Sequence, residues 1–121
     1  MAEIRPFRGI RPTREKAAAI AALPYDVYTR KEAEKEVERN PESFLRIDRA
    51  DTQFPISVNM YDERVYRKAH DMLWELVADG TFLREEKKSY YIYELTMNGR
   101  VQTGIVACAS IDDYLSGVIK K

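Results

Sequence analysis

The clearest pattern of apolar and polar residues lies between Asp62 and Asp79. Apolar residues recur there three or four positions apart, the spacing that places side chains on one face of an α-helix. Gly80 follows, and glycine commonly ends a helix in the left-handed conformation. The pattern predicts a helix over residues 62–79 whose apolar face is central to stability. The stripe consists of Val65, Ala69, Met72, Leu73, Leu76 and Val77, widened by Tyr66 and Trp74.

Other helices are predicted from signals at their ends. Thr29 and Glu32 stand three residues apart as a capping box, which predicts a helix that runs to about Arg39. Thr13 is the predicted N-cap of a shorter helix over residues 14–19. Asp112 is the predicted N-cap of a helix at the end of the chain.

The remaining pattern favours strands. Residues 89–97 are rich in Tyr, Ile and Thr, and Asn98-Gly99 is the preferred two-residue type I′ turn, so residues 100–111 are expected to return as the partner strand. Further strand candidates are residues 3–7, 43–49 and 82–83. The order of these elements predicts an α+β fold, a small mixed β-sheet of four or five strands with helices packed mainly on one face.

Length and composition narrow the possible classes of protein. The 121 residues suffice for one domain, and we expect a single α+β domain over residues 1–121 that is the N-terminal part of a longer protein. Twenty basic and twenty acidic residues cancel, so nucleic-acid binding through a net basic chain is not expected. No apolar run reaches 18 residues, which argues against a membrane span. The oligomeric state stays open.

The chain holds one cysteine and one histidine, Cys108 and His70. An internal disulfide is therefore impossible, which fits a cytoplasmic protein, and a Cys-His dyad or zinc-finger spacing is not expected. Cys108 stands in an apolar run and is predicted to be an inert core residue. Catalysis here would depend on carboxylates, Lys, Arg, Tyr or Ser.

Three arginines recur every third residue around Gly9, namely Arg5, Arg8 and Arg11. Guanidinium groups offer a planar fork of donors that suits phosphate or carboxylate, so Arg8 and Arg11 are candidates for binding a nucleotide. The alternative interpretation is a set of surface charges paired with the many glutamates, and spacing alone leaves both open.

Asp26 follows a rigid Pro24-Tyr25 step. A general base must be held in position, and proline restricts the backbone that leads to it. Tyr25 could shield the carboxylate. On the residues alone, a turn-forming or helix-capping aspartate is the stronger interpretation, because aspartate often serves turns.

Other polar residues are weaker candidates for ligand contact. Ser43 follows the turn at Pro41 and could hydrogen-bond a phosphate, although a helix stop explains this turn equally well. Asp48 ends a predicted strand, and Arg100 stands beside the predicted hairpin turn.

Several blocks of the chain resemble one known family. Residues 4–12 and 23–27, with the sequences IRPFRGIRP and LPYDV, resemble the opening of the bacterial and archaeal family catalogued as "domain of unknown function 1015". Residues 40–48, 61–66 and 104–114 resemble its further blocks. The resemblance covers essentially the whole chain, and the family's members are considerably longer.

The resemblance implies a fold and an activity. The family is linked to free L-serine kinases and, through them, to the ParB/sulfiredoxin-like fold, which handles nucleotides without a P-loop. It implies an ATP-dependent kinase for a small hydroxy amino acid, with Mg²⁺ at the phosphates. Asp26 would take the proton from the serine hydroxyl, and Arg8 and Arg11 would contact phosphates. Arg100 departs from the fold's usual phosphate motif, because it opens a strand rather than a helix.

Two other function classes remain. ParB-like domains can bind nucleotide as a switch, so a non-catalytic nucleotide-sensing or protein-interaction module is the main alternative. Sulfiredoxin-like redox chemistry is disfavoured, because Cys108 is the single thiol. The partners expected in either case are a nucleotide and a small molecule.

Overall fold

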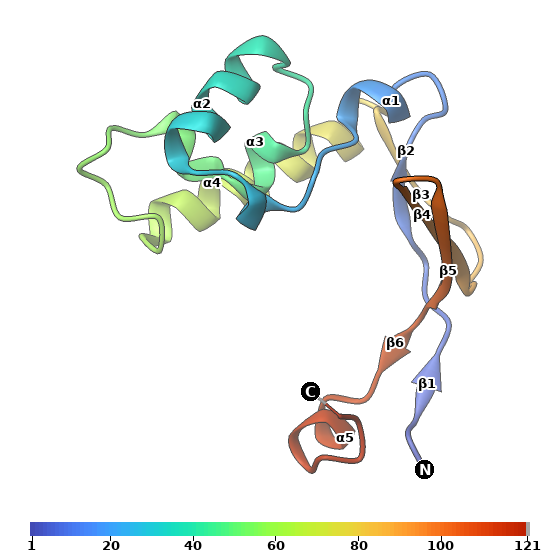
Figure 1. Ribbon diagram of the computed structural model, residues 1–121. Helices are drawn as coiled ribbons and strands as arrows, with labels where there is room; N and C mark the ends of the chain where they lie inside the picture. Colours follow the sequence, from blue (N-terminus) through green and yellow to red (C-terminus); the bar gives the residue numbers. More distant parts are fainter. Residues whose placement is uncertain (121) are drawn as a thin grey trace. The chain divides into compact units, whose positions relative to one another are not determined.

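The computed structural model describes residues 1–120 and confirms the α+β class (Figure 1). The elements are β1 (Ile4–Arg5), β2 (Ile10–Pro12), α1 (Ala17–Ile20), the 3₁₀ turn η1 (Tyr25–Val27), α2 (Arg30–Arg39), α3 (Leu45–Asp48), the 3₁₀ turn η2 (Ala50–Gln53), α4 (Glu63–Ala78), β3 (Phe82–Arg84), β4 (Tyr91–Met97), β5 (Arg100–Val106), β6 (Cys108–Ala109) and α5 (Ile111–Leu115).

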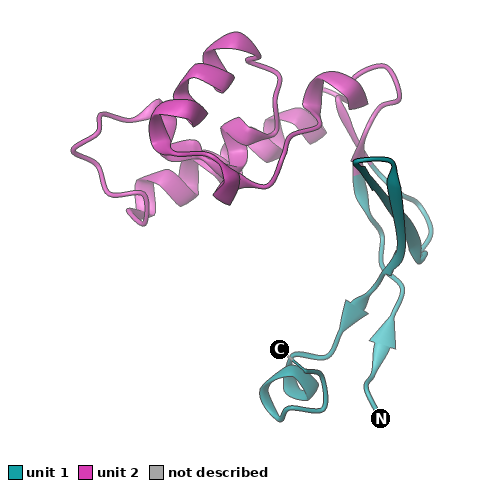
Figure 2. Ribbon diagram, viewed as in Figure 1, with its two compact units in different colours: residues 1–10, 84–121 teal, residues 11–83 magenta. Residues whose placement is uncertain are grey.

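The chain divides into two compact units (Figure 2). The helical unit comprises residues 11–83, and the sheet unit comprises residues 1–10 and 84–121. The boundary passes through β2 and β3. That the whole chain forms a single domain stays a prediction. Within residues 1–120, no helix combines the length and the apolar character needed to cross a membrane.

The strands of residues 1–120 form three sheets of two strands each, β1 with β6, β2 with β3, and β4 with β5. This corrects the expectation of one mixed sheet of four or five strands. The N-terminal extended segment is interrupted between Arg5 and Ile10, so its two halves pair with different partners. Pro6 and Gly9 lie in that interruption, and proline removes a ladder donor.

The predicted helices α2 and α4 are confirmed, together with the capping box of α2 and the glycine that follows α4. The Thr29 hydroxyl accepts from the backbone of Glu32, and the Glu32 carboxylate accepts from the backbone of Thr29, which completes the capping box. Asp62 caps α4 by accepting from the Arg64 backbone, and Gly80 follows that helix with a φ of 82°.

The core of the helical unit lies on the apolar face of α4. Val65 and Met72 are buried there together with Ala50 of η2. The partly buried side chains packed around them are Ile47, Phe54, Val58 and Ala69. Removing large side chains from water is worth roughly 1.5–3 kcal/mol each, so this face stabilises the unit.

The strand predicted over residues 43–49 is wrong, because the segment forms α3. The Ser43 hydroxyl accepts from the Leu45 backbone, and the Phe44 carbonyl accepts from the Asp48 backbone at 3.1 Å. Leu45 is completely buried. Seven residues fit both the strand and the helix period, so the choice is made by tertiary burial.

Two predicted caps are also corrected. The α1 helix begins at Ala17 after Lys16, without a side-chain cap, and Thr13 contributes only its carbonyl to the preceding turn. The hydroxyl of Ser110, not Asp112, caps α5 by accepting from the Asp113 backbone.

The predicted hairpin is confirmed in the sheet unit, but its second strand ends at Val106, and residue 111, the predicted end of that strand, begins α5. Both turn residues, Asn98 and Gly99, have positive φ angles of 51° and 75°, as a type I′ turn requires. Tyr91 of β4 ties the hairpin to the N-terminal segment, because its hydroxyl accepts from the Gly9 backbone at 2.7 Å. Cys108 is exposed on β6, which corrects its prediction as a core residue.

Candidate functional site

The turn that carries Asp26 has the form that the sequence predicted. Pro24 precedes it with a φ of −52°, and the Val27 backbone donates to the Pro24 carbonyl at 3.2 Å. Asp26 is exposed, and within residues 1–120 no hydrogen bond or ion pair engages its carboxylate. Tyr25 is 53% exposed, so it leaves this turn open to solvent.

A surface depression of about 510 Å³ adjoins this turn within the helical unit. Leu23 and Val27, which flank the turn, supply apolar lining, while Lys35 and Arg39 from α2 supply positive charge. The other lining residues are Tyr28, Glu32 and Glu36. The depression therefore combines apolar surface with two cations, and Asp26 is not among its lining residues.

The charges of α2 are partly compensated inside the depression. Arg39 pairs with Glu36, and its hydrogen bond lowers the pKa of the Glu36 carboxyl. Hydrogen bonds from Thr29 lower the pKa of Glu32. Both carboxyls are thus ionised at neutral pH, and an entering phosphate would have to compete with them for the cations.

The structure places the three N-terminal arginines in different surroundings. Arg5 pairs with Glu3, which matches the interpretation as a surface charge. Arg8 lies in the sheet unit and donates from Nε to the Glu85 carbonyl at 2.7 Å. Arg11 is exposed on β2 and belongs to the helical unit, as Asp26 does.

The remaining candidates are dispersed. Ser43 is buried and lines a separate cavity between α1, α3 and α4 that does not include Asp26. Asp48 ends α3 at the surface, where partial desolvation raises the pKa of its carboxyl. Arg100 is exposed at the start of β5 in the sheet unit. The residues named from sequence therefore do not form one site within either unit.

A buried ionic cluster escaped the sequence analysis. Arg49 and Asp51, 7% and 2% exposed, form a two-pronged pair in which Nε reaches Oδ1 at 3.0 Å and one terminal nitrogen reaches Oδ2 at 3.1 Å. Arg30 adds hydrogen bonds to the carbonyls of Asp51 and Phe54. Arg49 and Asp51 are two residues apart in the sequence, and this short spacing was the one local signal that could have predicted the ion pair.

The cluster also fixes the end of the Asp26 turn. A terminal nitrogen of Arg49 donates to the Tyr28 carbonyl at 3.1 Å. Burial alone would raise the pKa of Asp51, but the hydrogen bonds from Arg49 and the charges of Arg49 and Arg30 outweigh it and lower that pKa. Asp51 is therefore a buried anion that anchors two cations.

Comparison with known proteins identifies the family. Residues 4–121 match the model of a family described as "Protein of unknown function (DUF1015)". The match covers almost the whole chain, so the chain belongs to this family. No curated protein and no solved structure matches the chain.

Proposed function

We propose that this member of the DUF1015 family acts in the cytoplasm as an ATP-dependent kinase for a small hydroxy amino acid, with free L-serine as the candidate acceptor. The observation that carries the proposal is the state of Asp26. Its carboxylate is exposed on a short turn and engages no other group among residues 1–120. A carboxylate in this state is available to accept a proton.

The proposed step transfers the γ-phosphoryl group of ATP. The hydroxyl oxygen of serine forms the new bond to the γ-phosphorus, while the bond from that phosphorus to the bridging oxygen of ADP breaks. The hydroxyl proton goes to the Asp26 carboxylate, and the products are phosphoserine and ADP. A positioned base of this kind typically contributes about 10²–10⁴-fold to the rate.

Cations would supply the main electrostatic stabilisation. The transition state spreads negative charge over the transferred phosphoryl oxygens. Lys35 and Arg39 line the depression next to the Asp26 turn and support phosphate binding there. Arg8 and Arg11 stay proposed phosphate contacts, and Tyr25 stays a proposed ligand contact.

A metal ion would have to arrive with the nucleotide. Residues 1–120 contain no group of three His, Cys, Asp or Glu side chains able to hold one. Mg²⁺ usually keeps several waters and binds through one or two carboxylates together with the phosphates of the substrate. Bound in this way, Mg²⁺ would neutralise phosphate charge.

The test measures ADP and phosphoserine formation by the purified protein with ATP, Mg²⁺ and L-serine. We expect serine-dependent turnover, and Asp26→Asn is expected to lower kcat at least about 100-fold, because a base contributes that much. Asp71→Asn is the matched control, since Asp71 is an exposed aspartate on α4 whose one polar partner within residues 1–120 is the neighbouring His70.

Two outcomes would contradict the proposal. Equal turnover by the parent protein and Asp26→Asn would remove Asp26 from the mechanism. Nucleotide binding without serine-dependent consumption would instead favour a nucleotide-sensing module, the main alternative.

A further inference from the structure

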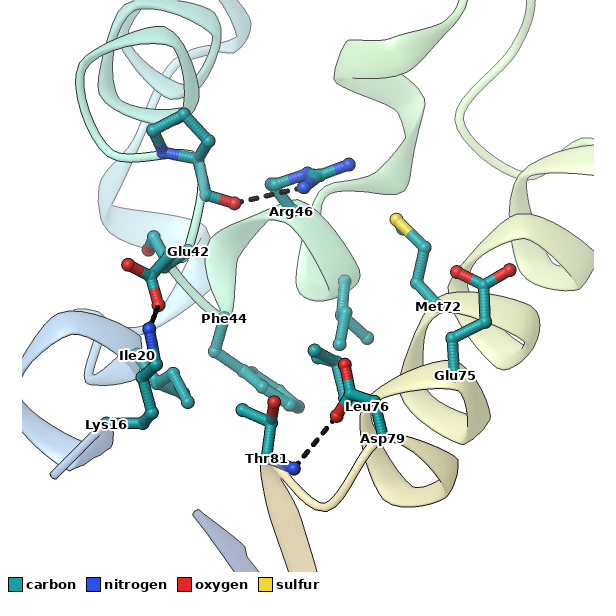
Figure 3. Close-up of a pocket in the computed structure, with 13 residues that line it drawn as sticks. Lys16, Ile20, Glu42, Phe44, Arg46, Met72, Glu75, Leu76, Asp79 and Thr81 are labelled. Atoms are coloured by element: carbon teal, nitrogen blue, oxygen red, sulfur yellow. Dashed lines mark hydrogen bonds and ion pairs between the residues drawn. The ribbon is translucent and has the colours of Figure 1, made fainter. Parts of the chain in front are cut away.

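A cavity of about 360 Å³ lies within the helical unit, between α1, α3 and α4 (Figure 3). Its floor is apolar and includes Ile20 of α1, Phe44 before α3, and Met72 and Leu76 of α4. Ile20 and Met72 are buried. The volume falls within the range of small-molecule sites, about 300–1,000 Å³.

The walls of the cavity are fixed by hydrogen bonds between distant segments. The Phe44 backbone donates to the Ile20 carbonyl at 2.8 Å, and the Asn40 side-chain amide donates to the Ala19 carbonyl at 2.7 Å. The Phe44 ring also contacts the Phe82 ring edge-on, with centroids 6.1 Å apart. These contacts hold α1 against the segment that leads into α3.

The two cations that line the cavity are already engaged. Lys16 Nζ lies 2.7 Å from the Glu42 carboxylate, and this pairing raises the pKa of Lys16. Arg46 donates to the Pro41 carbonyl at 3.0 Å and to the Gln53 side chain at 3.3 Å. Figure 3 shows the Lys16–Glu42 pair on the opposite side of the view from Glu75, with Arg46 between them at the top.

Glu75 of α4 and Asp79, the residue that follows this helix, line the same cavity one helical turn apart, and both are exposed. Glu75 makes no side-chain hydrogen bond or ion pair within residues 1–120, and Asp79 accepts a hydrogen bond from the Thr81 backbone at 2.8 Å. Hydrogen bonds from Thr81 lower the pKa of Asp79, so it is ionised at neutral pH. The charge of Lys16 also helps to lower the pKa of Asp79, but no salt bridge among residues 1–120 joins a cation to Glu75 or Asp79.

Ser43 adds a buried hydroxyl to the cavity. It is only 3% exposed and lines the cavity. Its Oγ accepts from the Leu45 backbone at 3.2 Å, but within residues 1–120 no acceptor takes its hydroxyl hydrogen. A buried donor normally finds an acceptor, and a ligand oxygen in the cavity would supply one.

We propose that this cavity binds a small organic ammonium ion, a primary amine on an apolar body. The ammonium group sits at Glu75 and Asp79, and the apolar body covers Phe44, Met72 and Leu76. Where that body also carries an oxygen, this oxygen accepts the hydrogen bond from Ser43. The site is separate from Asp26 and does not depend on the proposed kinase activity.

The test uses three probes that share a phenyl group and differ in the charge of the head group. Phenethylamine, 3-phenyl-1-propanol and 3-phenylpropionate are each titrated into the ¹⁵N-labelled protein, and backbone amide resonances are followed. We expect phenethylamine to shift the resonances of residues 43, 75, 76 and 79, 3-phenyl-1-propanol to bind more weakly, and 3-phenylpropionate to leave them unchanged.

Two substitutions locate the site. Glu75→Gln is expected to raise the Kd of phenethylamine about tenfold or more, because it removes a charged hydrogen-bond acceptor. Glu63→Gln, at the other end of α4, is the matched control and should leave the Kd unchanged. Leu76→Trp fills the cavity and should abolish binding while the circular dichroism spectrum stays that of the parent.

The proposal is overturned if 3-phenylpropionate binds as tightly as the amine, or if Glu75→Gln and Leu76→Trp both leave the Kd unchanged. Serine-dependent ATP consumption is measured for the same variants. An unchanged rate beside weakened amine binding supports a site separate from Asp26, so the two proposals can fail independently.

Discussion

The helical unit buries apolar side chains, whereas the β4–β5 hairpin leaves them exposed. Val65 and Met72 of α4 are buried against η2 and α3. In the hairpin, Ile92 and Ile105 face each other as cross-strand partners, yet they are 80% and 78% exposed. No third strand pairs with β4 or β5 within residues 1–120.

The difference shows that apolar content does not by itself decide burial. The stripe on α4 finds neighbours, so its area contributes to stability. An isolated two-stranded hairpin is only marginally stable in water, and this one relies on its turn and on the Tyr91 contacts with Phe7 and Gly9. Substitutions in the two regions should therefore differ sharply in cost.

The largest effect is expected at the buried ion pair of the helical unit. Asp51→Asn leaves Arg49 buried without its partner charge, which should cost about 3–5 kcal/mol in the free energy of unfolding. Chemical denaturation at neutral pH measures the cost. Glu63→Gln, which breaks an exposed pair with Arg67, is the control and should cost less than about 1 kcal/mol.

The same carboxyl gives this stability a pH dependence. The pKa of Asp51 is lower in the folded chain than its ordinary value of 3.8. Because the pKa of Asp51 is lower in the folded chain than in the unfolded chain, its carboxylate stabilises the fold at a pH above the unfolded pKa. This contribution is lost as the pH falls through the folded pKa. The Asp51→Asn variant should lose this part of the acid sensitivity, and an unchanged acid profile would contradict the role of the pair.

The next effect compares leucines of the two units. Leu45→Ala removes a completely buried side chain of α3 and should cost about 2–5 kcal/mol. Leu95→Ala, on the half-exposed face of β4, should cost no more than about 0.5 kcal/mol. Denaturation midpoints measure both, and similar losses would show that the hairpin is covered in solution.

The smallest effect concerns a close approach in the sheet unit. A methyl group at Gly9 would lie 2.8 Å from the Tyr91 ring and hydroxyl, so Gly9→Ala should cost roughly 1–3 kcal/mol through overpacking. Gly104→Ala in β5 is the matched control, because a methyl group there meets nothing within 4 Å. Loss of the Tyr91 contacts can be followed by the chemical shifts of Phe7 and Gly9, and equal behaviour of the two variants would refute the clash.

The sequence predicted those elements whose signals are local. The capping box at Thr29, the stripe of α4 and the Asn98-Gly99 turn each specify their structure within a few residues, and all three are confirmed. Tyr66 and Trp74, which were expected to widen the stripe, are exposed instead. The segment that forms α3 is too short for its period to be distinguished, and its conformation depends on the burial of Leu45. Which strands pair with each other could not be predicted either, because pairing joins residues that are far apart in the sequence.

The candidate sites show the same division. The turn at Asp26 follows from Pro24 and was predicted, while its catalytic role stays a proposal. The cavity of the helical unit could not be predicted, because it joins residues from three helices and depends on how they pack. Glu75 was not named from the sequence, since nothing local distinguishes it from the other acids.

The exposure of Cys108 has a practical consequence. It is the chain's one thiol, it is exposed on β6, and its partner in the β1–β6 pairing is Arg5. A maleimide spin label or fluorophore would therefore attach at a single defined position without any prior substitution. Such a label would report on whether β1 and β6 stay paired while nucleotide or amine is added.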